Sequence, residues 1–205
     1  MHRLEARSRP QQDRSRKRVD YILDTAEKLV MTNGYESVTA QMISQHTNIS
    51  PGVIYHYFPG KHSIFAAVAK RAFTRLEIRM QEIYSKASAD KPLAELIDEI
   101  INDLAKYWLE NKGELVMWQV LEHSPRMDPI TSELKEKAIQ RNAALIKVYF
   151  PKRKPAEIRI KAIIMEETSF CLLRQLFTLK PNDARRLIKE LKTIQINLLG
   201  GSRGL

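Results

Sequence analysis

Residues 39–61 read TAQMISQHTNISPGVIYHYFPGK. The pattern of this stretch predicts two short helices joined by a tight turn. The second predicted helix carries Tyr55, His56 and Tyr57 on consecutive positions, and Lys61 follows shortly after. Hydroxyl and ammonium donors at the end of a short helix suit a DNA groove and its phosphates better than a protein core. The stretch therefore predicts a helix-turn-helix that reads DNA.

The ends of both predicted helices are marked by residues that favour such positions. Thr39 suits the N-cap of the first helix, and the free N–H groups of a helix N-terminus favour a phosphate. Asn48 stands where the turn needs a positive φ, which Asn adopts more readily than most residues. Ser50 suits the N-cap of the second helix, with Pro51 at its first position, where the missing N–H costs nothing.

The side chains of the second helix are expected to divide between DNA and the core. Gly52 is small enough to let the backbone approach DNA, and a Val53 methyl can contact a thymine methyl. Ile54 and Phe58 are expected to point into the core. His56 is expected to reach a base or the DNA backbone. The predicted DNA-binding residues are Thr39, Gln41, Ser50, Gly52, Val53, Tyr55, His56, Tyr57 and Lys61, with Tyr55, Tyr57 and Lys61 as phosphate donors.

Along the rest of the chain, apolar residues recur at spacings of three and four, which is typical of helices. From Lys17 to Asn33 they form one face of a helix, composed of Tyr21, Ile22, Ala26, Leu29 and Val30. We expect an all-α chain of about nine helices. The expected parts are a basic flexible arm (1–16), a three-helix helix-turn-helix domain (17–62), a larger helical ligand-binding and dimerisation domain (63–199) and a flexible tail (200–205).

The charge of the chain favours an anionic partner. The 205 residues carry a formal net charge of +10. Residues 1–19 hold seven Arg or Lys and two acids, a local charge of +5. This arm contains few apolar residues, so we expect it to stay disordered until it meets a polyanion. Contact with phosphates or the minor groove is one reading of the arm, and a plain solvated tail is the other.

Several classes of protein are disfavoured. The one cysteine, Cys171, excludes an internal disulfide and a CxxC metal site, and its apolar neighbours favour a buried, inert thiol. No run of about 18 apolar residues predicts a membrane span, and the N-terminus lacks the apolar region of a signal peptide. A reducing cytoplasm fits these features.

The stretch resembles the N-terminal DNA-binding domain of the TetR family of bacterial transcription regulators. The matching pieces are an apolar helix ending in NGY at 33–35, VT at 38–39, and ISPGVIYHYFPGK at 49–61, within a resemblance over residues 17–65. Asn48 stands where the family usually has glycine, and Ser44 where it usually has alanine. The resemblance assigns Thr39, Tyr55, Tyr57 and Lys61 to phosphate contacts and Gly52 and Val53 to the groove; His56 lies at a variable position.

The same resemblance implies a homodimer on a palindromic operator, with half-sites about 34 Å apart. It also implies a C-terminal domain that binds a small molecule and dimerises through its last two helices. The largely apolar faces of these two helices are wide enough for an interface between subunits, although packing within one chain is the alternative. The residues along these faces are Ile158, Ala162, Met165, Ser169, Leu172 and Leu176 on the first helix, and Leu187, Ile188, Leu191, Ile194 and Leu198 on the second.

A ligand pocket can be predicted only from residue type. Met and aromatic side chains adapt to irregular ligands, although they are equally common in an ordinary core. The candidate lining residues are Trp108, Met117, Trp118, Leu121, Met165 and Phe170. His123, Glu166 and Arg174 are the polar groups that could orient a ligand, and each also has an ordinary structural role as its alternative.

Rival functions lack sequence support. The chain contains no nucleophile elbow, HExxH, GxGxxG or P-loop, and its five histidines have no metal-ligand spacing, so we expect no enzyme, no metal and no cofactor. An architectural DNA binder would show weak sequence preference and steep salt dependence. An adaptor using the basic arm on membranes or proteins is a third alternative. We expect a repressor that binds an operator as a homodimer and is released by a small apolar or aromatic molecule, with no membrane partner.

Overall fold

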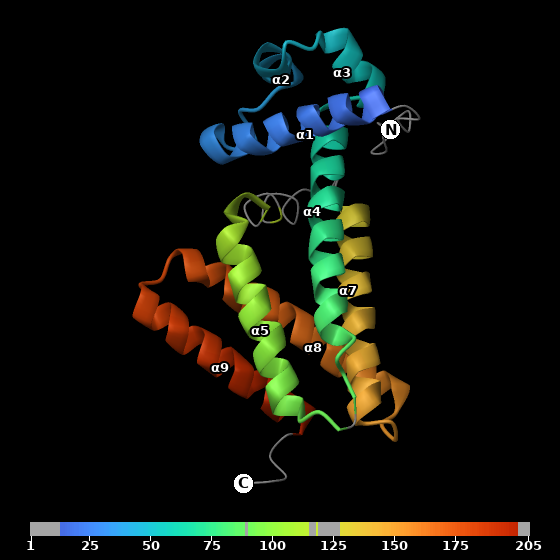
Figure 1. Ribbon diagram of the computed structural model, residues 1–205, viewed down its shortest axis with the longest axis vertical. Helices are drawn as coiled ribbons and strands as arrows, with labels where there is room; N and C mark the ends of the chain where they lie inside the picture. The colour runs from blue at the N-terminus through green and yellow to red at the C-terminus, as the bar shows by residue number, and fades with distance from the viewer. Residues whose placement is uncertain (1–12, 89, 115–117, 119–127, 201–205) are drawn as a thin grey trace. The chain divides into compact units, whose positions relative to one another are not determined.

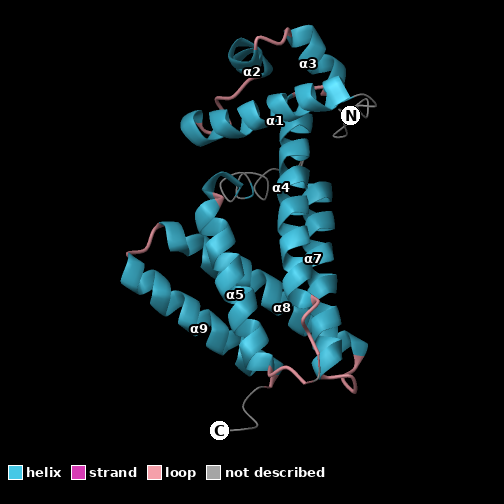
Figure 2. Ribbon diagram, viewed as in Figure 1, coloured by secondary structure: helices cyan, strands magenta, loops and turns pink. Residues whose placement is uncertain are grey.

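The computed structural model describes residues 13–88, 90–114, 118 and 128–200, and every regular element in them is helical (Figures 1 and 2). The prediction of an all-α chain with about nine helices is confirmed. The elements are α1 (Asp13–Asn33), α2 (Ala40–Thr47), α3 (Pro51–Tyr57), α4 (Lys61–Tyr84), α5 (Leu93–Glu110), α7 (Asp128–Tyr149), α8 (Pro155–Leu173), the 3-10 helix η1 (Arg174–Phe177) and α9 (Pro181–Leu199).

The chain folds as two compact units. The first comprises Met1–Thr74 and Lys112–Ser132, and the second comprises Arg75–Asn111 and Glu133–Leu205. The division falls inside α4, beyond the expected boundary at residue 62, because the first fourteen residues of this helix pack with the helix-turn-helix. Helix α1 begins at Asp13, so the last four residues of the expected arm are helical. The rest of the arm and residues 201–205 of the expected tail lie outside the described residues.

The first unit is held by an apolar core to which its first four helices all contribute. Side chains of α1, α2, α3 and α4 are excluded from water there, and burying each contributes roughly 1.5–3 kcal/mol to folding. The fully buried members are Ile22 and Ala26 of α1, Ile43 of α2, Ile54 of α3, and Ile64, Phe65 and Val68 of α4, together with Phe58 just after α3.

Short-range interactions define the ends of α2 and α3. Thr39 caps α2, since its Oγ accepts a hydrogen bond from the Met42 amide at 3.1 Å. Asn48 closes α2 in the left-handed region with φ 55°, as the sequence predicts. Pro51 occupies the first turn of α3 after Ser50, which stands at the N-cap without a side-chain capping bond. Thr39, Asn48 and Pro51 therefore define the ends of α2 and the start of α3 through interactions within a few residues.

The second unit packs α5, α8 and α9 around an apolar interior. Helix α5 contacts both α8 and α9, and α8 contacts α9. The buried side chains include Leu96, Ile97, Ile100 and Ile101 of α5, Ala162 and Met165 of α8, and Leu191 and Leu199 of α9. Among the described helices of both units, none combines the length and the apolarity needed to cross a membrane.

A polar network lies inside the second unit. Tyr84 Oη of α4 donates to Asn142 Oδ1 of α7 at 2.6 Å, and Asn142 Nδ2 donates to Glu166 Oε2 of α8 at 3.3 Å. Arg141 pairs with Glu77, and its guanidinium lies 5.0 Å from the centre of the Tyr84 ring. Burial raises the pKa of Glu166 and of Tyr84, and it lowers the pKa of Arg141. The network ties α4, α7 and α8 together.

Asn48 gives a test of the turn, because its exposed side chain leaves the backbone conformation as the main variable. Asn48→Ala is expected to lower the free energy of unfolding by about 1 kcal/mol, the cost of a left-handed conformation for an ordinary residue. Asn48→Gly should leave it nearly unchanged. Urea unfolding measures both, and equal midpoints for the Ala and Gly variants would contradict the role given to φ.

Glu166 gives a pH test of the network. Because its folded-state pKa is raised above the ordinary 4.5, the protonated carboxyl favours the fold, and this stabilisation is lost as the pH rises through the raised value. Glu166→Gln stays neutral and is expected to raise the urea midpoint at pH 8 more than at pH 5. The control is Glu190→Gln, at an exposed position of α9 in the same unit. A gain for Glu166→Gln that is equal at both pH values would refute the assignment.

Candidate nucleic-acid interface

Helix α2 presents polar side chains on the side away from its core contacts. Ala40, Ile43 and Thr47 are buried, whereas Gln41 and His46 are exposed. The His46 ring is held by a 2.8 Å hydrogen bond between Nδ1 and the Met42 carbonyl oxygen. Thr39 is exposed, with its hydroxyl oxygen engaged in the cap. Two predicted residues, Thr39 and Gln41, thus lie at the exposed start of α2.

Helix α3 has one exposed face. Gly52, Tyr55 and His56 are exposed and lie three and four residues apart, with Val53 half-buried beside them. Tyr55 keeps 47 % of its surface in solvent. A Cβ built on Gly52 would meet no atom within 4 Å, so the fold of this chain does not itself require glycine there. A requirement for a small residue at this position would come from a molecule that approaches α3.

Tyr57 differs from the expected surface tyrosine. Its ring is buried, because Ile54, Tyr57 and Phe58 are spaced to face the core together. Its hydroxyl oxygen lies 3.1 Å from Ser15 Oγ of α1. Contact between Tyr57 and a phosphate stays a prediction, and it now concerns the hydroxyl group alone.

Lys61, the first residue of α4, is occupied within the protein. Its Nζ donates to the Glu36 carbonyl at 2.9 Å, lies 3.8 Å from the Glu36 carboxylate and sits 4.3 Å from the centre of the Tyr35 ring. Phosphate contact by Lys61 also stays a prediction. The structure adds that Lys61 supports the turn before α2, so its substitution would disturb more than one contact.

Tyr21 of α1 was predicted to share one apolar face with Ile22 and Ala26, but it does not share their burial. The side chain is 49 % exposed, and its hydroxyl donates to the His46 carbonyl at 3.5 Å. The inward face of α1 follows Ile22, Ala26 and Leu29, and Tyr21 lies about 100° away from Ile22 around the helix. Tyr21 follows Lys17 by four residues, which places both on the same side of the helix. This spacing could have indicated from the sequence that Tyr21 belongs to a polar face.

The predicted pocket residues that the structure describes are divided between the two units. Trp108 and Phe170 lie in the second unit with their ring centres 6.3 Å apart at 73°, and Met165 is buried in the same unit. Trp118 belongs to the first unit, where its ring stacks on Phe73 with centres 6.3 Å apart. Met117, Leu121 and His123 lie outside the described residues.

Two of the predicted polar groups have identified neighbours. Glu166 belongs to the network with Asn142, and Arg174 Nη2 lies 3.6 Å from Cys171 Sγ. The expectation of a buried Cys171 is wrong, since the thiol is exposed. Cys171 follows Ala162 by nine residues, about two and a half helical turns, so it lies on the opposite side of α8 from this fully buried alanine.

The terminal helices use much of their predicted apolar face within the chain. Ile158, Ala162, Met165, Leu176 and Leu191 are buried in the second unit. The apolar side chains of α8 and α9 that remain exposed are mostly different ones, namely Ile160, Ile164 and Cys171 on α8 and Ile194 on α9.

Two family models match the chain in sequence. Residues 22–68 match the model of bacterial regulatory proteins of the tetR family, and residues 92–199 match that of the tetracyclin repressor-like C-terminal domain. The first covers the helix-turn-helix, and the second covers more than half of the chain.

Individual relatives agree with these matches. The chain is 24 % identical over 180 residues to an uncharacterized helix-turn-helix transcriptional regulator, YuxN, of Bacillus subtilis (strain 168), covering 82 % of this chain and 59 % of YuxN. It is 32 % identical over 85 residues to a fatty acid metabolism regulator protein of the same organism, covering 41 % and 44 %. The chain thus spans about half the length of these curated relatives.

A solved structure supports the fold. The fatty acid degradation regulator FadR of Bacillus halodurans is 18 % identical and aligns with a TM-score of 0.73 over 95 % of this chain and 99 % of that one. At this identity the likeness concerns the fold alone. The first family model matches the helix-turn-helix, and the second matches the helices that follow it along the chain. Together the two matches show that this chain belongs to the tetR family of bacterial regulatory proteins.

Proposed function

We propose that the chain is a ligand-responsive transcriptional repressor that binds a palindromic operator as a homodimer. The observation that carries this proposal is the exposed face of α3, where Gly52, Tyr55 and His56 stand opposite the buried Ile54 and Phe58. A helix held in this way can enter the major groove of B-DNA, where base edges are distinguishable. Tyr55 supplies a hydroxyl donor to phosphate, and Val53 supplies methyl groups to a thymine.

A homodimer would place two copies of α3 on successive major grooves. Exposed Ile160, Ile164 and Cys171 form a stripe along α8, and Ile194 of α9 is also exposed. Apolar side chains of this number on terminal helices are commonly covered by a partner. The dimer interface proposed here therefore uses this stripe in place of the inward residues that spacing alone suggested.

The effector proposed is a small apolar or aromatic molecule that binds the second unit near Trp108, Met165 and Phe170. The relative named as a fatty acid metabolism regulator protein agrees with an apolar effector. Helix α4 belongs to both units, so binding that displaces its second half would alter the spacing of the two copies of α3. A ligand can do this only if it binds the two states with different affinity.

Val53 and Tyr55 test the DNA proposal. Operator DNA is obtained by selection from random sequence, and binding is followed by fluorescence anisotropy with random competitor. Tyr55→Phe removes one hydroxyl from each protomer and is expected to weaken binding about tenfold per protomer, as for a hydrogen bond to a charged group of ~1.5 kcal/mol. Val53→Ala should reduce discrimination between operator and competitor. Val148→Ala, at an exposed valine of α7, is the control.

Each outcome of this experiment bears on the proposal. Wild-type binding that is weak and equal on all DNA would favour an architectural binder over a specific repressor. Specific binding that survives both Tyr55→Phe and Val53→Ala unchanged would show that α3 is not the reading helix.

Ile164 tests the dimer. Ile164→Glu places a charge in the exposed stripe of α8 and is expected to convert a dimer to a monomer at micromolar concentration, because an unpaired charge in an apolar interface is costly. Sedimentation velocity measures the change. Ile78→Glu, at an exposed isoleucine of α4, is the matched control and should remain dimeric. A monomeric wild-type protein, or a dimeric Ile164→Glu variant, would contradict the proposed interface.

A further inference from the structure

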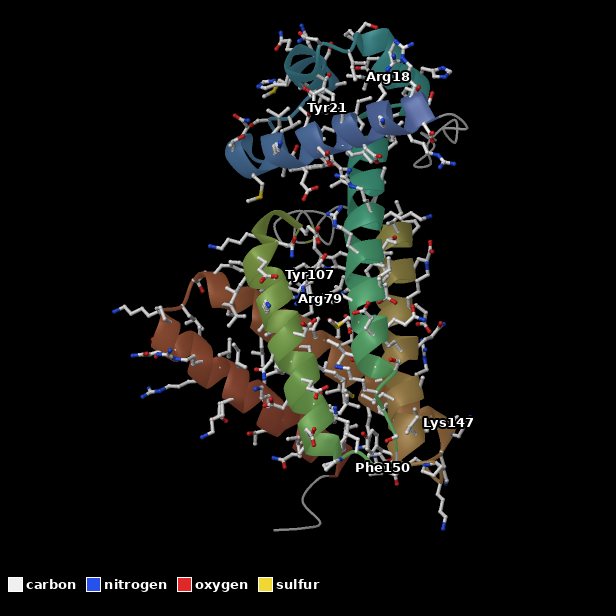
Figure 3. All side chains as sticks on the ribbon, in the orientation of Figure 1. Arg18, Tyr21, Arg79, Tyr107, Lys147 and Phe150 are labelled. Carbon is white, nitrogen blue, oxygen red and sulfur yellow. The ribbon has the colours of Figure 1, made fainter. Side chains whose placement is uncertain are left out.

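The first two turns of α1 carry cations on the same side as an exposed tyrosine. Arg14, Lys17, Arg18 and Tyr21 are spaced three and four residues apart, which places them along one face of the helix. Arg14, Lys17 and Tyr21 are exposed, and Arg18 is half-buried. Figure 3 labels Arg18 and Tyr21, and both lie on the side of α1 where α2 and α3 are found. The four residues are called the α1 basic face below.

Three of the four acids of the same helix lie near a single arginine of α4, and the fourth, Asp13, is exposed in the first turn of α1. Arg71 of α4 lies 3.9 Å from Asp20, 2.8 Å from Asp24 and 3.2 Å from Glu27, in the same unit. Within the described residues, no acid lies at ion-pair distance from Arg14, Lys17 or Arg18. The acids that follow Arg18 are thus attached to α4, whereas Arg14, Lys17 and Arg18 form no ion pair within the described residues.

Two side-chain hydrogen bonds fix the α1 basic face beside the helix-turn-helix. The Tyr21 hydroxyl donates to the His46 carbonyl at the end of α2, at 3.5 Å. Ser15 Oγ lies 3.1 Å from Tyr57 Oη at the end of α3. The basic face thus begins near the last residue of the recognition helix and ends near the turn that precedes it, and all of these groups belong to the first unit.

The dimensions of this face match a DNA strand. Seven residues of helix separate Arg14 from Tyr21, a length of about 10 Å. Phosphates on one strand of B-DNA advance by roughly 3.4 Å each along the axis, so the face spans on the order of three phosphates. Side chains with long flexible stems and single charges are suited to the phosphate backbone, whereas base readout requires groups inserted into a groove.

We propose that the α1 basic face is a second DNA-contact surface, which binds backbone phosphates flanking the base pairs that α3 reads. This inference rests on the proposed DNA-binding function and deepens it, since it assigns affinity and position to α1 and sequence reading to α3. Contacts of this kind carry no sequence information, so they strengthen binding to operator and to random DNA alike.

The test compares two double variants that remove the same charge from the same unit. Arg14→Gln with Lys17→Gln neutralises two residues of the basic face, and glutamine keeps a high helix propensity. Lys28→Gln with Lys70→Gln neutralises two exposed lysines outside the face. Binding to selected operator DNA is measured by fluorescence anisotropy at several salt concentrations, and circular dichroism with thermal unfolding verifies that both variants fold.

We expect the slope of log affinity against log salt to become less steep by about 1.8 per bound protomer in the first variant, which is about 0.9 for each lost phosphate contact. The control variant should keep the wild-type slope. The ratio of operator to random-DNA affinity should stay at the wild-type value in both. Hydroxyl-radical footprinting of the first variant should lose protection at the outer edges of the operator only.

Failure of this inference differs from failure of the proposed function. If the wild-type protein binds no selected DNA, the proposed function itself is wrong, and the assignment of the basic face to phosphates is wrong as well. If the wild type binds specifically while both double variants keep its slope, or reduce it equally, the basic face is not a phosphate site. An unchanged footprint in the first variant would also overturn the assignment of the basic face to phosphates. Lys17→Glu checks the result with a single substitution, because reversing this charge should weaken binding more than removing it.

Discussion

The seven-residue helix α3 depends on three side chains that it buries. Isolated helices shorter than about 12–15 residues are marginal in water, so α3 cannot hold its conformation by its own hydrogen bonds. Ile54, Tyr57 and Phe58 fix it to the core of the first unit, and Ile54 and Phe58 are almost fully excluded from solvent. The direction of every α3 side chain proposed to meet DNA follows from this attachment, because the side of α3 that the core does not cover is the side left exposed.

The positions of the charged side chains in the first unit also affect how it can bind DNA. Arg71 lies within 3.9 Å of three acids of α1, which joins α1 to α4 and offsets one of the three negative charges. Arg14, Lys17 and Arg18 of α1 have no such partners within the described residues. A chain of net charge +10 can attract a polyanion anywhere on its surface, but only an arrangement of unpaired cations beside a groove-reading helix orients that attraction.

The second unit places polar bonds where α4 meets its neighbours. The hydrogen bonds from Tyr84 to Asn142 and from Asn142 to Glu166, with the pair of Arg141 and Glu77, give α4 a specific register against α7 and α8. A buried hydrogen bond that is broken leaves an unsatisfied group, at a cost of roughly 1–3 kcal/mol. Any effector that displaces α4 must therefore supply differential binding energy of at least this order, or replace these partners with its own.

The helical class, both ends of α2 and the start of α3 could be predicted from the sequence alone. Thr39 at a cap, Asn48 at a positive φ and Pro51 in a first turn act through atoms within a few residues, so a linear reading is sufficient. Only the tertiary structure decided which side chains are available. Tyr57 and Lys61 are engaged by Ser15 and Glu36, Tyr21 and Cys171 are exposed, and Trp118 lies in a different unit from Trp108. Burial depends on which distant helix packs against a face. Apolar periodicity identifies the face but does not identify the helix that packs against it.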